Sequence, residues 1–425
     1  MHMRIAALAA CLAAFLACAP AMAADRLTLD DAIRRVEQAH PDLRLVGAKR
    51  DVLAAGLDQA SLRPPLVLGA SVENVMGTGD RRFLDSAEAT VTLASVFERG
   101  GKLEARRTLA QSRIDALAVD REAKRLDLLA EVARRYLAVV AAQRQRDVAV
   151  QDIAQRRRTV AGARHRFTAG ASPQSVVFAA EAALSRAELE RARAQQRERS
   201  ARQHLAALWG ERDPQFAVAS GNPYALPALE AFSALSAWLD RTPEIVQLTG
   251  ERRIREARLQ LARSQATPDW SWEVGARHFR EGNDVGVLAS ISIPLGSRSR
   301  AQPEIRAAEA ELAMLEIERE SRDLSLYSTL ADAHGRYLSA QLEVRLLGRE
   351  VIPKLGQAEN AAERAYRAGA ISYLEWAQLQ SERTIARKQQ LEAALEAQRA
   401  LIEIQRLTGQ PFVEGAATNE QGEDQ

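Results

Sequence analysis

Apolar residues at helical spacing occupy two long stretches of the chain. They recur every three, four or seven positions, which is typical of helices that pack through a coiled-coil seam. The seam residues are Val119, Leu126, Leu129, Ala133, Tyr136 and Val140, and then Leu330, Ala333, Tyr337, Ala340, Val344 and Leu347. Residues 102–167 contain no proline, and at 1.5 Å per residue these roughly 66 residues span about 100 Å. The pattern therefore predicts very long helices.

A second pattern alternates apolar and polar residues and predicts β-strands. It occurs at 66–73 and 88–96, and more cleanly at 270–277 and 285–294. We expect two hairpins with strands of about ten residues, the length of a tilted membrane strand. Trp270 and Trp272 fall on one face near a strand start, where an interfacial aromatic girdle would place them. One isolated hairpin would equally suit a soluble protein, but the pair occurs twice.

Several landmarks indicate a tandem duplication. The turn segment 166–171 is echoed by 365–370, and their glycines, Gly170 and Gly369, lie 199 residues apart. Gly210 and Gly409 have the same separation. The repeated unit of about 200 residues is much longer than a solenoid repeat of about 20 to 50. Each copy is predicted to contain one long helical hairpin.

The duplication gives the predicted division of the chain. Residues 1–23 form a signal peptide, 211–228 a connector or equatorial segment rich in Gly and Pro, and 411–425 a polar tail. Two repeats, 24–210 and 229–410, each contain shorter helices, two strands and a long helical hairpin. These segments are 28–62, 66–97 and 102–209 in the first repeat, and 230–266, 269–294 and 300–408 in the second. Pro41 and Pro353 are expected to break or kink their helices.

The first 23 residues have a basic start, an apolar run and a small-x-small site, as in a cleaved secretory signal. A transmembrane anchor is the alternative, although the apolar run is shorter than the roughly 20 residues that a spanning helix needs. Both cysteines, Cys11 and Cys18, lie in this segment, so the mature chain is expected to lack disulfides. Cys18 is alternatively a lipidation site, but the leucine usual three residues earlier is Phe15 here.

Composition and charge narrow the possible partners. Lys and Arg total 58 against 56 for Asp and Glu, a balance that gives no reason to expect nucleic acid as a partner.

After the signal no apolar run is long enough for a membrane helix, so entry into a membrane would require a β-barrel. Four strands cannot close a transmembrane barrel, whose minimum is about eight. A barrel would therefore require several chains.

Signatures of catalysis and cofactor binding are absent from the sequence. There is no glycine-rich phosphate loop, no Gly-x-Ser-x-Gly elbow and no His-Glu-x-x-His run. The histidines of the mature chain are not spaced as metal ligands. We therefore expect a protein that is not an enzyme and that has no catalytic, cofactor or metal site. The histidines are His40, His165, His204, His278 and His334.

The signal peptide, the duplicated strand pair with its long helical hairpin, and the Tyr-x-x-Gly turn together resemble the TolC family of outer-membrane channel proteins. The resemblance covers nearly the whole mature chain. It implies a mainly α fold with a β-barrel portion, assembled as a homotrimer. Twelve strands would form a barrel in contact with outer-membrane lipid, and the helices would continue it as an α-barrel across the periplasm.

Segment 97–102, with Glu98, Gly100, Gly101 and Lys102, is similar to the CzcC-like heavy-metal efflux branch of that family. The branch implies passive exit of cations such as cobalt, zinc and cadmium. It also implies a periplasmic adaptor (membrane fusion) protein and an inner-membrane resistance-nodulation-division (RND) pump as partners. Drug efflux and type I secretion are alternatives within the fold. A soluble periplasmic coiled-coil adaptor is the alternative from another class.

In the family the glycine turns form the periplasmic tip, where the adaptor docks and the channel closes. By this resemblance Phe167, Gly170, Tyr366 and Gly369 mark the tip. Two acidic residues beyond the second turn form rings in TolC. The corresponding positions here are Glu375 and Gln378, so one acid of the two is absent, and only Glu375 can form a cation-selective ring. The alternative is that Glu375 is a solvated helix residue.

Overall fold

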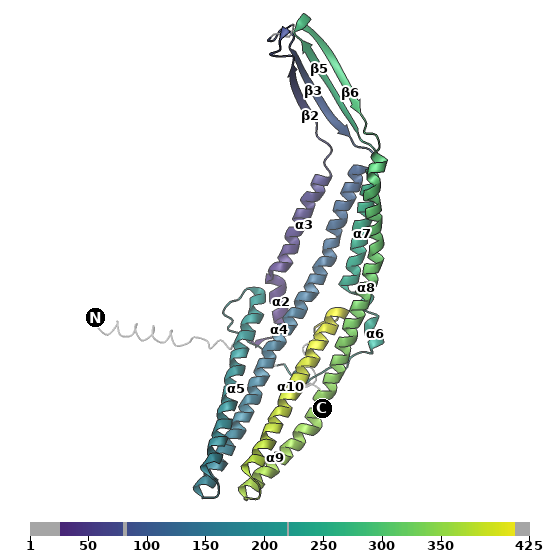
Figure 1. Ribbon diagram of the computed structural model, residues 1–425. Coiled ribbons are helices and arrows are strands. Elements are labelled where there is room, and N and C mark those ends of the chain that lie inside the picture. The colour runs from purple at the N-terminus through teal and green to yellow at the C-terminus, as the bar shows by residue number, and fades with distance from the viewer. Residues whose placement is uncertain (1–25, 80–82, 219–220, 413–425) are drawn as a thin grey trace, which may run out of the picture.

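The computed structural model describes residues 26–79, 83–218 and 221–412. It shows an elongated molecule with a β-sheet at one end and the turns of two helical hairpins at the other (Figure 1). The predicted signal peptide with Cys18 and residues 413–425 of the predicted tail lie outside the described residues. Within the described ranges, no helix combines the length and the hydropathy that a bilayer-spanning segment needs.

The mainly helical, duplicated fold predicted from the sequence is confirmed. Both halves run from shorter helices through two strands into a long helical hairpin (Figure 1). The first half consists of α2 (Leu29–Ala39), α3 (Pro41–Ala60), β2 (Val67–Glu73), β3 (Glu88–Phe97), α4 (Lys102–Thr168), α5 (Gln174–Ala206) and a 3-10 turn (Ala207–Trp209). The second half consists of α6 (Phe232–Ser236), a 3-10 turn (Leu239–Arg241), α7 (Pro243–Ser264), β5 (Trp270–Phe279), a 3-10 turn (Glu281–Asn283), β6 (Asp284–Ser292), α8 (Ser297–Leu346), a π-helical turn (Leu347–Val351), α9 (Ile352–Arg367) and α10 (Tyr373–Thr408).

Local sequence explains where the first helices begin and end. Thr28 caps α2 in a capping box with Asp31, which satisfies free backbone N–H groups. Pro41 occupies the first turn of α3, where its missing N–H costs nothing, so the predicted break falls there. The second half copies this arrangement less closely than expected. Within segment 230–266, only the five-residue α6 and a 3-10 turn precede the long helix α7.

The long outgoing helix of the second half is interrupted close to Pro353. The irregular part is the π-helical turn just before α9, and Pro353 lies in the first turn of α9. Proline cannot donate a backbone hydrogen bond to the preceding turn, so one carbonyl there loses its helical partner. A single π-helical turn is a common way to absorb such a defect.

Four antiparallel strands form one sheet in the order β2-β3-β5-β6. The two hairpins of the duplication therefore lie side by side, with β3 paired to β5 across the repeat boundary. β2 has seven residues instead of the expected ten. The residue after it, Asn74, has a φ of 58° and leaves the extended conformation, and its side chain donates to Glu88 at 2.8 Å.

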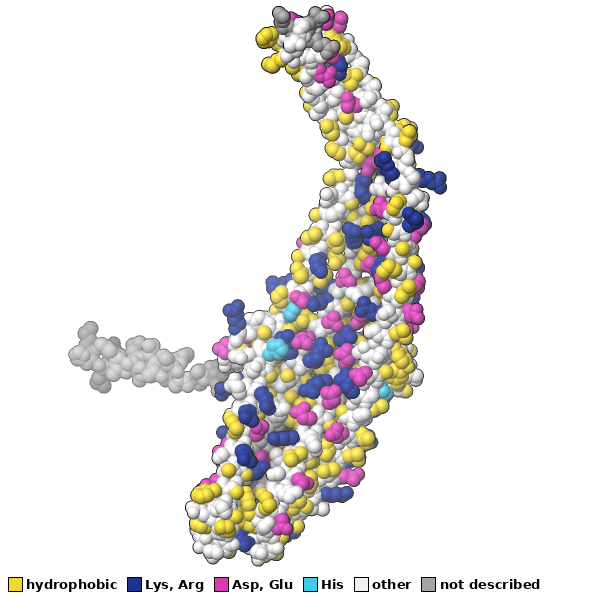
Figure 2. All heavy atoms as spheres, viewed as in Figure 1, with side chains coloured by type: hydrophobic (Ala, Val, Ile, Leu, Met, Phe, Trp, Pro, Cys, Tyr) yellow, Lys and Arg dark blue, Asp and Glu magenta, His cyan; other side chains and the backbone are white. Residues whose placement is uncertain are grey.

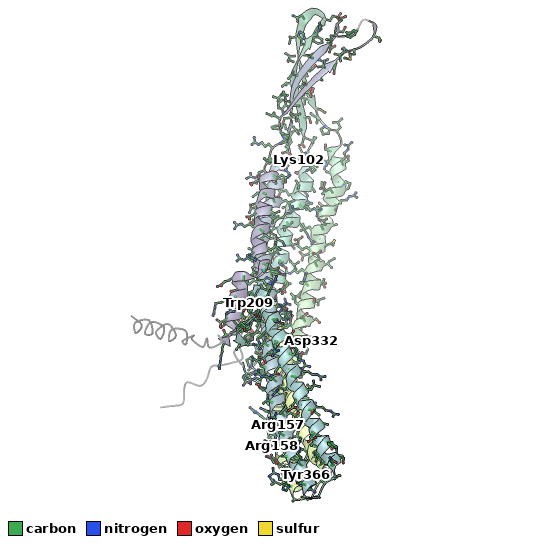
Figure 3. The ribbon with its side chains drawn as sticks, turned by 90° about the vertical axis from the view of Figure 1, so that its left-hand side faces the viewer. Lys102, Arg157, Arg158, Trp209, Asp332 and Tyr366 are labelled. Atoms are coloured by element: carbon green, nitrogen blue, oxygen red, sulfur yellow. The ribbon has the colours of Figure 1, made fainter. Side chains whose placement is uncertain are left out.

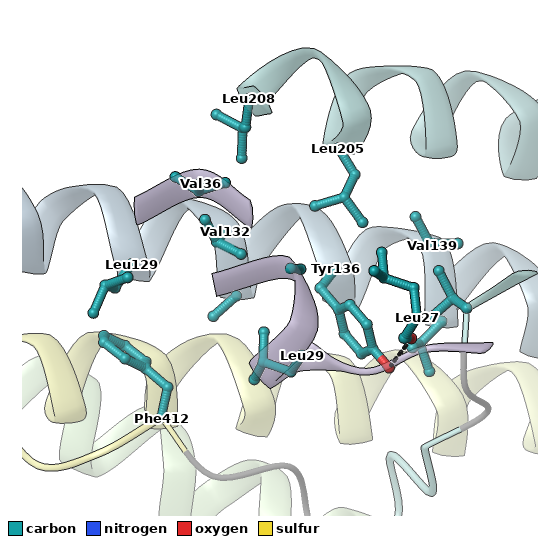
Figure 4. Close-up of a cluster of buried hydrophobic side chains, with 14 of the residues drawn as sticks. Leu27, Leu29, Val36, Leu129, Val132, Tyr136, Val139, Leu205, Leu208 and Phe412 are labelled. Atoms are coloured by element: carbon teal, nitrogen blue, oxygen red, sulfur yellow. Dashed lines mark hydrogen bonds between the residues drawn. The ribbon is translucent and has the colours of Figure 1, made fainter. Parts of the chain in front are cut away.

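The main core lies at mid-body, where the two repeats and the connector meet. A parallel pairing of β1 (Arg26–Leu27) with β4 (Ala217–Val218), which the sequence pattern does not reveal, ties the start of the described chain to the connector. Tyr136 of α4 is buried there and its hydroxyl donates to the carbonyl of Leu27 at 3.3 Å (Figure 4). Its counterpart Tyr337 is fully buried in the second repeat and donates to the Pro227 carbonyl.

Charged side chains of both signs are interspersed over the face of the helices that Figure 2 shows. Many of them form ion pairs between neighbouring helices. Arg255 of α7, for example, contacts Glu318 of α8 at 2.7 Å, and Arg258 contacts Glu311 at the same distance. Most such pairs are exposed, so each contributes only about 0 to 1 kcal/mol.

Candidate functional site

One face of the sheet is almost entirely apolar. Directly opposed residues of neighbouring strands share a face, so the pairing register assigns every side chain to one side. Many of these residues are open to solvent in the single chain, and Val287 is 87% exposed. Apart from Ser95 and His278, the face consists of Leu68, Ala70, Val72, Ala89, Val91, Leu93, Phe97, Trp270, Trp272, Val274, Ala276, Val285, Val287, Ala289 and Ile291.

The opposite face carries the acidic residues of the sheet, Arg277 and most of its other polar side chains, together with a smaller number of apolar ones, namely Val67, Ala94, Val96, Phe279 and Leu288. Arg277 of β5 contacts Glu88 of β3 at 2.8 Å and Glu73 of β2 at 3.5 Å, which links three strands near their ends distant from the helices. Glu273 lies on the same face, opposite Ala94 and Ser290. The sheet thus separates an apolar surface from a polar one, while β2 and β6 each pair along one side only within the described residues.

The segment with Glu98, Gly100, Gly101 and Lys102 forms the junction between strand and helix. Lys102, at the start of α4, is 6% exposed, and its Nζ lies 2.7 Å from Asp269, which immediately precedes β5 (Figure 3). The same carboxylate accepts a hydrogen bond from the Arg99 backbone N–H at 3.0 Å. One aspartate therefore joins the two repeats where the sheet meets the helices.

The other motif residues secure this junction. Glu98 binds Arg106 through two contacts at 2.5 and 2.9 Å, and Arg106 also donates to carbonyls at the end of α3. Gly100 and Gly101 have φ values of 73° and 74°, a left-handed conformation that other residues adopt only with strain. The contacts and backbone conformations of the motif residues thus together hold the turn from strand β3 into helix α4.

At the opposite end, the two hairpin turns lie next to each other. Gly170 and Gly369 have φ values of 69° and 81°, the left-handed conformation typical of a helix C-terminus. Phe167 is 41% exposed, whereas Tyr366 is only 2% exposed. The four residues named from the sequence therefore fall at one end of the molecule, and Tyr366 is the buried member.

Two residues missed by sequence reasoning hold Tyr366. Its ring lies 5.0 Å from the ring of Trp376, which is also 2% exposed. Arg166 of the first turn stacks over Tyr366 at 4.9 Å and donates to its carbonyl oxygen, so the two hairpins contact each other through this group. Trp376 lies seven residues beyond Gly369, and nothing in the spacing marked it as a partner of the turn.

A buried polar network joins the hairpins just before their turns. Thr159 of α4 and Gln380 of α10 exchange hydrogen bonds of 3.0 and 2.8 Å. Glu359 of α9 accepts from Gln155 and, at 2.7 Å, from Arg383. Burial, with a smaller contribution from the neighbouring Arg383, holds the pKa of Arg387 below its ordinary value. This interface is polar where the mid-body core is apolar.

The comparison with known families covers most of the chain. Residues 32–211 and 234–410 match the family described as outer membrane efflux protein. The chain belongs to this family. Its fold and family are those of channel proteins, and the resemblance to TolC-family channels inferred from the sequence is confirmed.

Relatives within the efflux family include metal resistance proteins. The chain is 28% identical to the cobalt-zinc-cadmium resistance protein CzcC of Cupriavidus metallidurans, over 84% of each chain. It is 25% identical to the nickel-cobalt-cadmium resistance protein NccC of Alcaligenes xylosoxydans xylosoxydans, over 66% of this chain and 65% of that protein.

Solved structures share the fold of this efflux-family chain. CusC matches with a TM-score of 0.74 at 19% identity, over 89% of this chain and 91% of that one. The open-state MtrE outer membrane channel of Neisseria gonorrhoeae matches with a TM-score of 0.71 at 19% identity, over 90% and 89% of the two chains.

The two positions expected to constrict the efflux channel lie beyond the second turn. Glu375 is exposed and forms a capping box with Ser372, whose backbone N–H and hydroxyl both donate to its carboxylate at 2.7 and 2.8 Å. These bonds hold the pKa of Glu375 below its ordinary value, so the side chain is ionised at neutral pH. Gln378 is exposed and donates to Glu382 at 3.3 Å. A capping role for Glu375 leaves its charge available on the surface.

Proposed function

We propose that this protein is the passive outer-membrane exit duct for heavy-metal cations in a tripartite efflux system, and that it has no catalytic activity. A periplasmic adaptor and an inner-membrane RND pump would complete the system, and the pump would supply the energy. The observation that carries the proposal is the separation of one apolar and one polar face on an exposed sheet. An apolar face suits lipid, and a polar face suits a water-filled lumen.

The open edges of the sheet support assembly from three copies. Exposed edge strands carry unpaired backbone groups, which are costly in a membrane unless the sheet closes on itself. Pairing β6 of one copy with β2 of the next satisfies both edges. Three copies of a four-stranded sheet give twelve strands, which exceeds the minimum of about eight for a membrane barrel.

Cysteine scanning tests this assembly. Both natural cysteines lie in the predicted signal peptide, so one cysteine introduced in β2 and one in β6 of the same chain would be the only thiols of the mature chain. We expect some β2–β6 pairs to give disulfide-linked species of two and three chain masses under oxidation. Matched cysteines placed in the central strands β3 and β5 should give none. Cross-linking that is no greater at the edges than in the central strands would contradict the assembly.

Metal cations as cargo are supported by the relatives named for cobalt, zinc, cadmium and nickel resistance and by the motif at the strand–helix junction. The decisive experiment is the growth of a strain that lacks this protein on zinc, cobalt, cadmium, nickel, copper and silver salts, with lipophilic drugs in parallel. We expect sensitivity confined to one group of metals and restored by the intact gene. Sensitivity to drugs alone would retain the channel and overturn the metal assignment.

Membrane location separates this proposal from a soluble periplasmic adaptor. We expect the mature protein to stay with outer membranes through salt and alkaline washes and to require detergent for extraction. Release without detergent would exclude the channel function. The same preparation shows by mass spectrometry whether the chain begins near Ala24 or carries lipid at Cys18.

The proposed role of Glu375 as a ring of three carboxylates is tested in planar bilayers. We expect Glu375→Ala to lower cation selectivity or cation block, because three negative charges around the axis attract cations. Glu375→Asp keeps the charge and the capping group and should behave like the natural protein. Equal selectivity in all three proteins would assign Glu375 to helix capping alone.

A further inference from the structure

Unpaired arginines form a band where the sheet meets the helices. Arg63 lies four residues before β2, Arg99 two residues after β3, and Arg298 and Arg300 in the first turn of α8, which follows β6. Because β2 begins and β3 and β6 end at the helical side of the sheet, these residues lie at one level of the molecule (Figure 1). All are exposed, and no carboxylate of the described residues lies within ion-pair distance of their guanidinium groups. We call these residues the arginine band.

Acidic residues of the chain do not neutralise the arginine band. The segments 59–72 and 285–303 contain no Asp or Glu, although the whole chain has 56 such residues against 58 Lys and Arg. The carboxylates of Glu98 and Asp269 at the junction are each bound to another basic side chain. Figure 2 shows Lys and Arg side chains that project from the surface at this level, over the start of α8. The level therefore carries positive charge without a protein counter-ion.

The arginine band lies at the end of the apolar face of the sheet. The guanidinium carbon of Arg99 is 4.4 Å from the centre of the Trp270 ring, which belongs to that face. This stacking uses the flat face of the guanidinium and leaves the N–H groups at its rim free to donate. Leu66 and Leu295, close to the arginines in the chain, are 65% and 87% exposed. Apolar side chains give way to arginines here, as hydrocarbon gives way to headgroups in a bilayer.

The proposed assembly would concentrate the charge at each boundary between copies. β2 starts and β6 ends at the helical side, so the two strands run in opposite directions and can pair. Arg298 and Arg300 of one copy would then lie at the level of Arg63 of the next. Like charges at such a boundary repel each other unless an anion lies between them.

We propose that the arginine band binds the phosphate groups of anionic phospholipids in the leaflet on the helical side of the membrane. The N–H groups of a guanidinium match the geometry of a phosphate, and clusters of Arg beside membrane segments attract anionic lipids. The acyl chains would lie along the apolar face that begins at Trp270. This inference rests on the proposed function, because it places that face in a bilayer.

Quenching of tryptophan fluorescence by brominated lipids tests the arginine band, because bromine quenches tryptophans that the lipid touches. Of the five tryptophans of the chain, only Trp270 and Trp272 lie in the sheet. Trp272→Phe therefore leaves Trp270, beside Arg99, as the reporter. The full-length protein is reconstituted in phosphatidylcholine bilayers that contain brominated phosphatidylglycerol or brominated phosphatidylcholine at the same mole fraction. We expect phosphatidylglycerol to be preferred at Trp270 by at least about five-fold.

A triple variant removes three charges of the band and leaves the contact between Arg99 and Trp270. It carries Arg63→Gln, Arg298→Gln and Arg300→Gln. We expect the preference for phosphatidylglycerol to fall at least about five-fold, with unchanged quenching by phosphatidylcholine. Lysine at the same three positions keeps the charges and should retain a preference for phosphatidylglycerol.

Three other arginines provide a matched control. Arg113, Arg121 and Arg253 are exposed, and none forms an ion pair within the described residues. They lie at least eleven residues along α4 or α7 from the junction, or about 16 Å, which exceeds the screening length of about 8 Å at physiological salt. Glutamine at these three positions should leave the preference within about two-fold of that of the natural protein.

The outcomes separate this inference from the proposed function. Equal quenching by the two brominated lipids would overturn the lipid preference and leave the channel. Absence of quenching by either lipid would contradict insertion of the sheet in a bilayer and would overturn both proposals. Equal losses of preference in the two triple glutamine variants would show a diffuse electrostatic effect and would refute the arginine band as a site. Circular dichroism spectra establish that each variant is folded.

Discussion

The two adjacent glycines of the strand–helix junction allow a controlled test of its packing. Gly100 and Gly101 have nearly the same φ, 73° and 74°, so alanine costs the same backbone strain at both positions, about 1 to 2 kcal/mol. Their surroundings differ. A Cβ on Gly100 would lie 2.6 Å from the Thr267 Cβ and 2.9 Å from the Ser264 carbonyl oxygen, whereas a Cβ on Gly101 would meet nothing within 4 Å.

The clash at Gly100 involves a backbone carbonyl that cannot rotate away. Inserting a methyl group into a tight contact costs about 1 to 3 kcal/mol more. We therefore expect Gly101→Ala to lower the free energy of unfolding by about 1 to 2 kcal/mol and Gly100→Ala by about 2 to 5 kcal/mol. The difference between the two variants isolates the packing of the α7 end against the junction.

Urea titration of the full-length protein in detergent, followed by circular dichroism in both directions, measures these differences. Gly79→Ala is a further control, because Gly79 also has a positive φ and no atom of the described residues lies within 4 Å of its Cβ position. It should behave like Gly101→Ala. Equal destabilisation of the Gly100 and Gly101 variants would refute the packing argument and leave only backbone strain.

Three other predictions concern charge and pH. Lys102→Met and Asp269→Asn should show a coupling of about 1 to 3 kcal/mol in a double-mutant cycle of unfolding free energies, because Lys102 is buried while Asp269 is partly open. Additive effects of the two substitutions would exclude a direct interaction. Tyr337→Phe should cost about 1 kcal/mol through loss of the hydrogen bond to Pro227. Burial raises the pKa of Tyr337 from 10.0 to about 12. The stabilising contribution of the neutral phenol is therefore complete below pH 10 and is lost between pH 10 and 12. Alkaline unfolding curves of the Tyr337→Phe variant should lack this loss. The pKa of Glu375 is lowered, so its capping contribution should be present above its ordinary value and lost in acid, and Glu375→Gln should remove that pH dependence from the melting of the tip.

The family relationship and the order of elements were predictable from the sequence because each depends on local patterns. Helical spacing marked the seam through Tyr136 and Tyr337, and both residues are buried. Positive φ at Gly170 and Gly369 follows from the need to end one helix and begin another within a few residues. Alternation marked both strand pairs, although the early end of β2 at Asn74 depended on a side-chain contact across the hairpin.

Contacts between distant residues required the tertiary structure. The sequence placed Lys102 in a motif, but only the fold brings Asp269, 167 positions away, to its side chain. Likewise the apolar face of the sheet depends on the register between β3 and β5, and a shift of one residue would have exchanged the faces. Local propensity sets where an element begins and ends, whereas partners separated by half of the chain are chosen by the packing of the two repeats against each other. The polar network before the hairpin turns is the clearest case, since Thr159 and Gln380 come from different repeats and meet only when the two hairpins lie side by side.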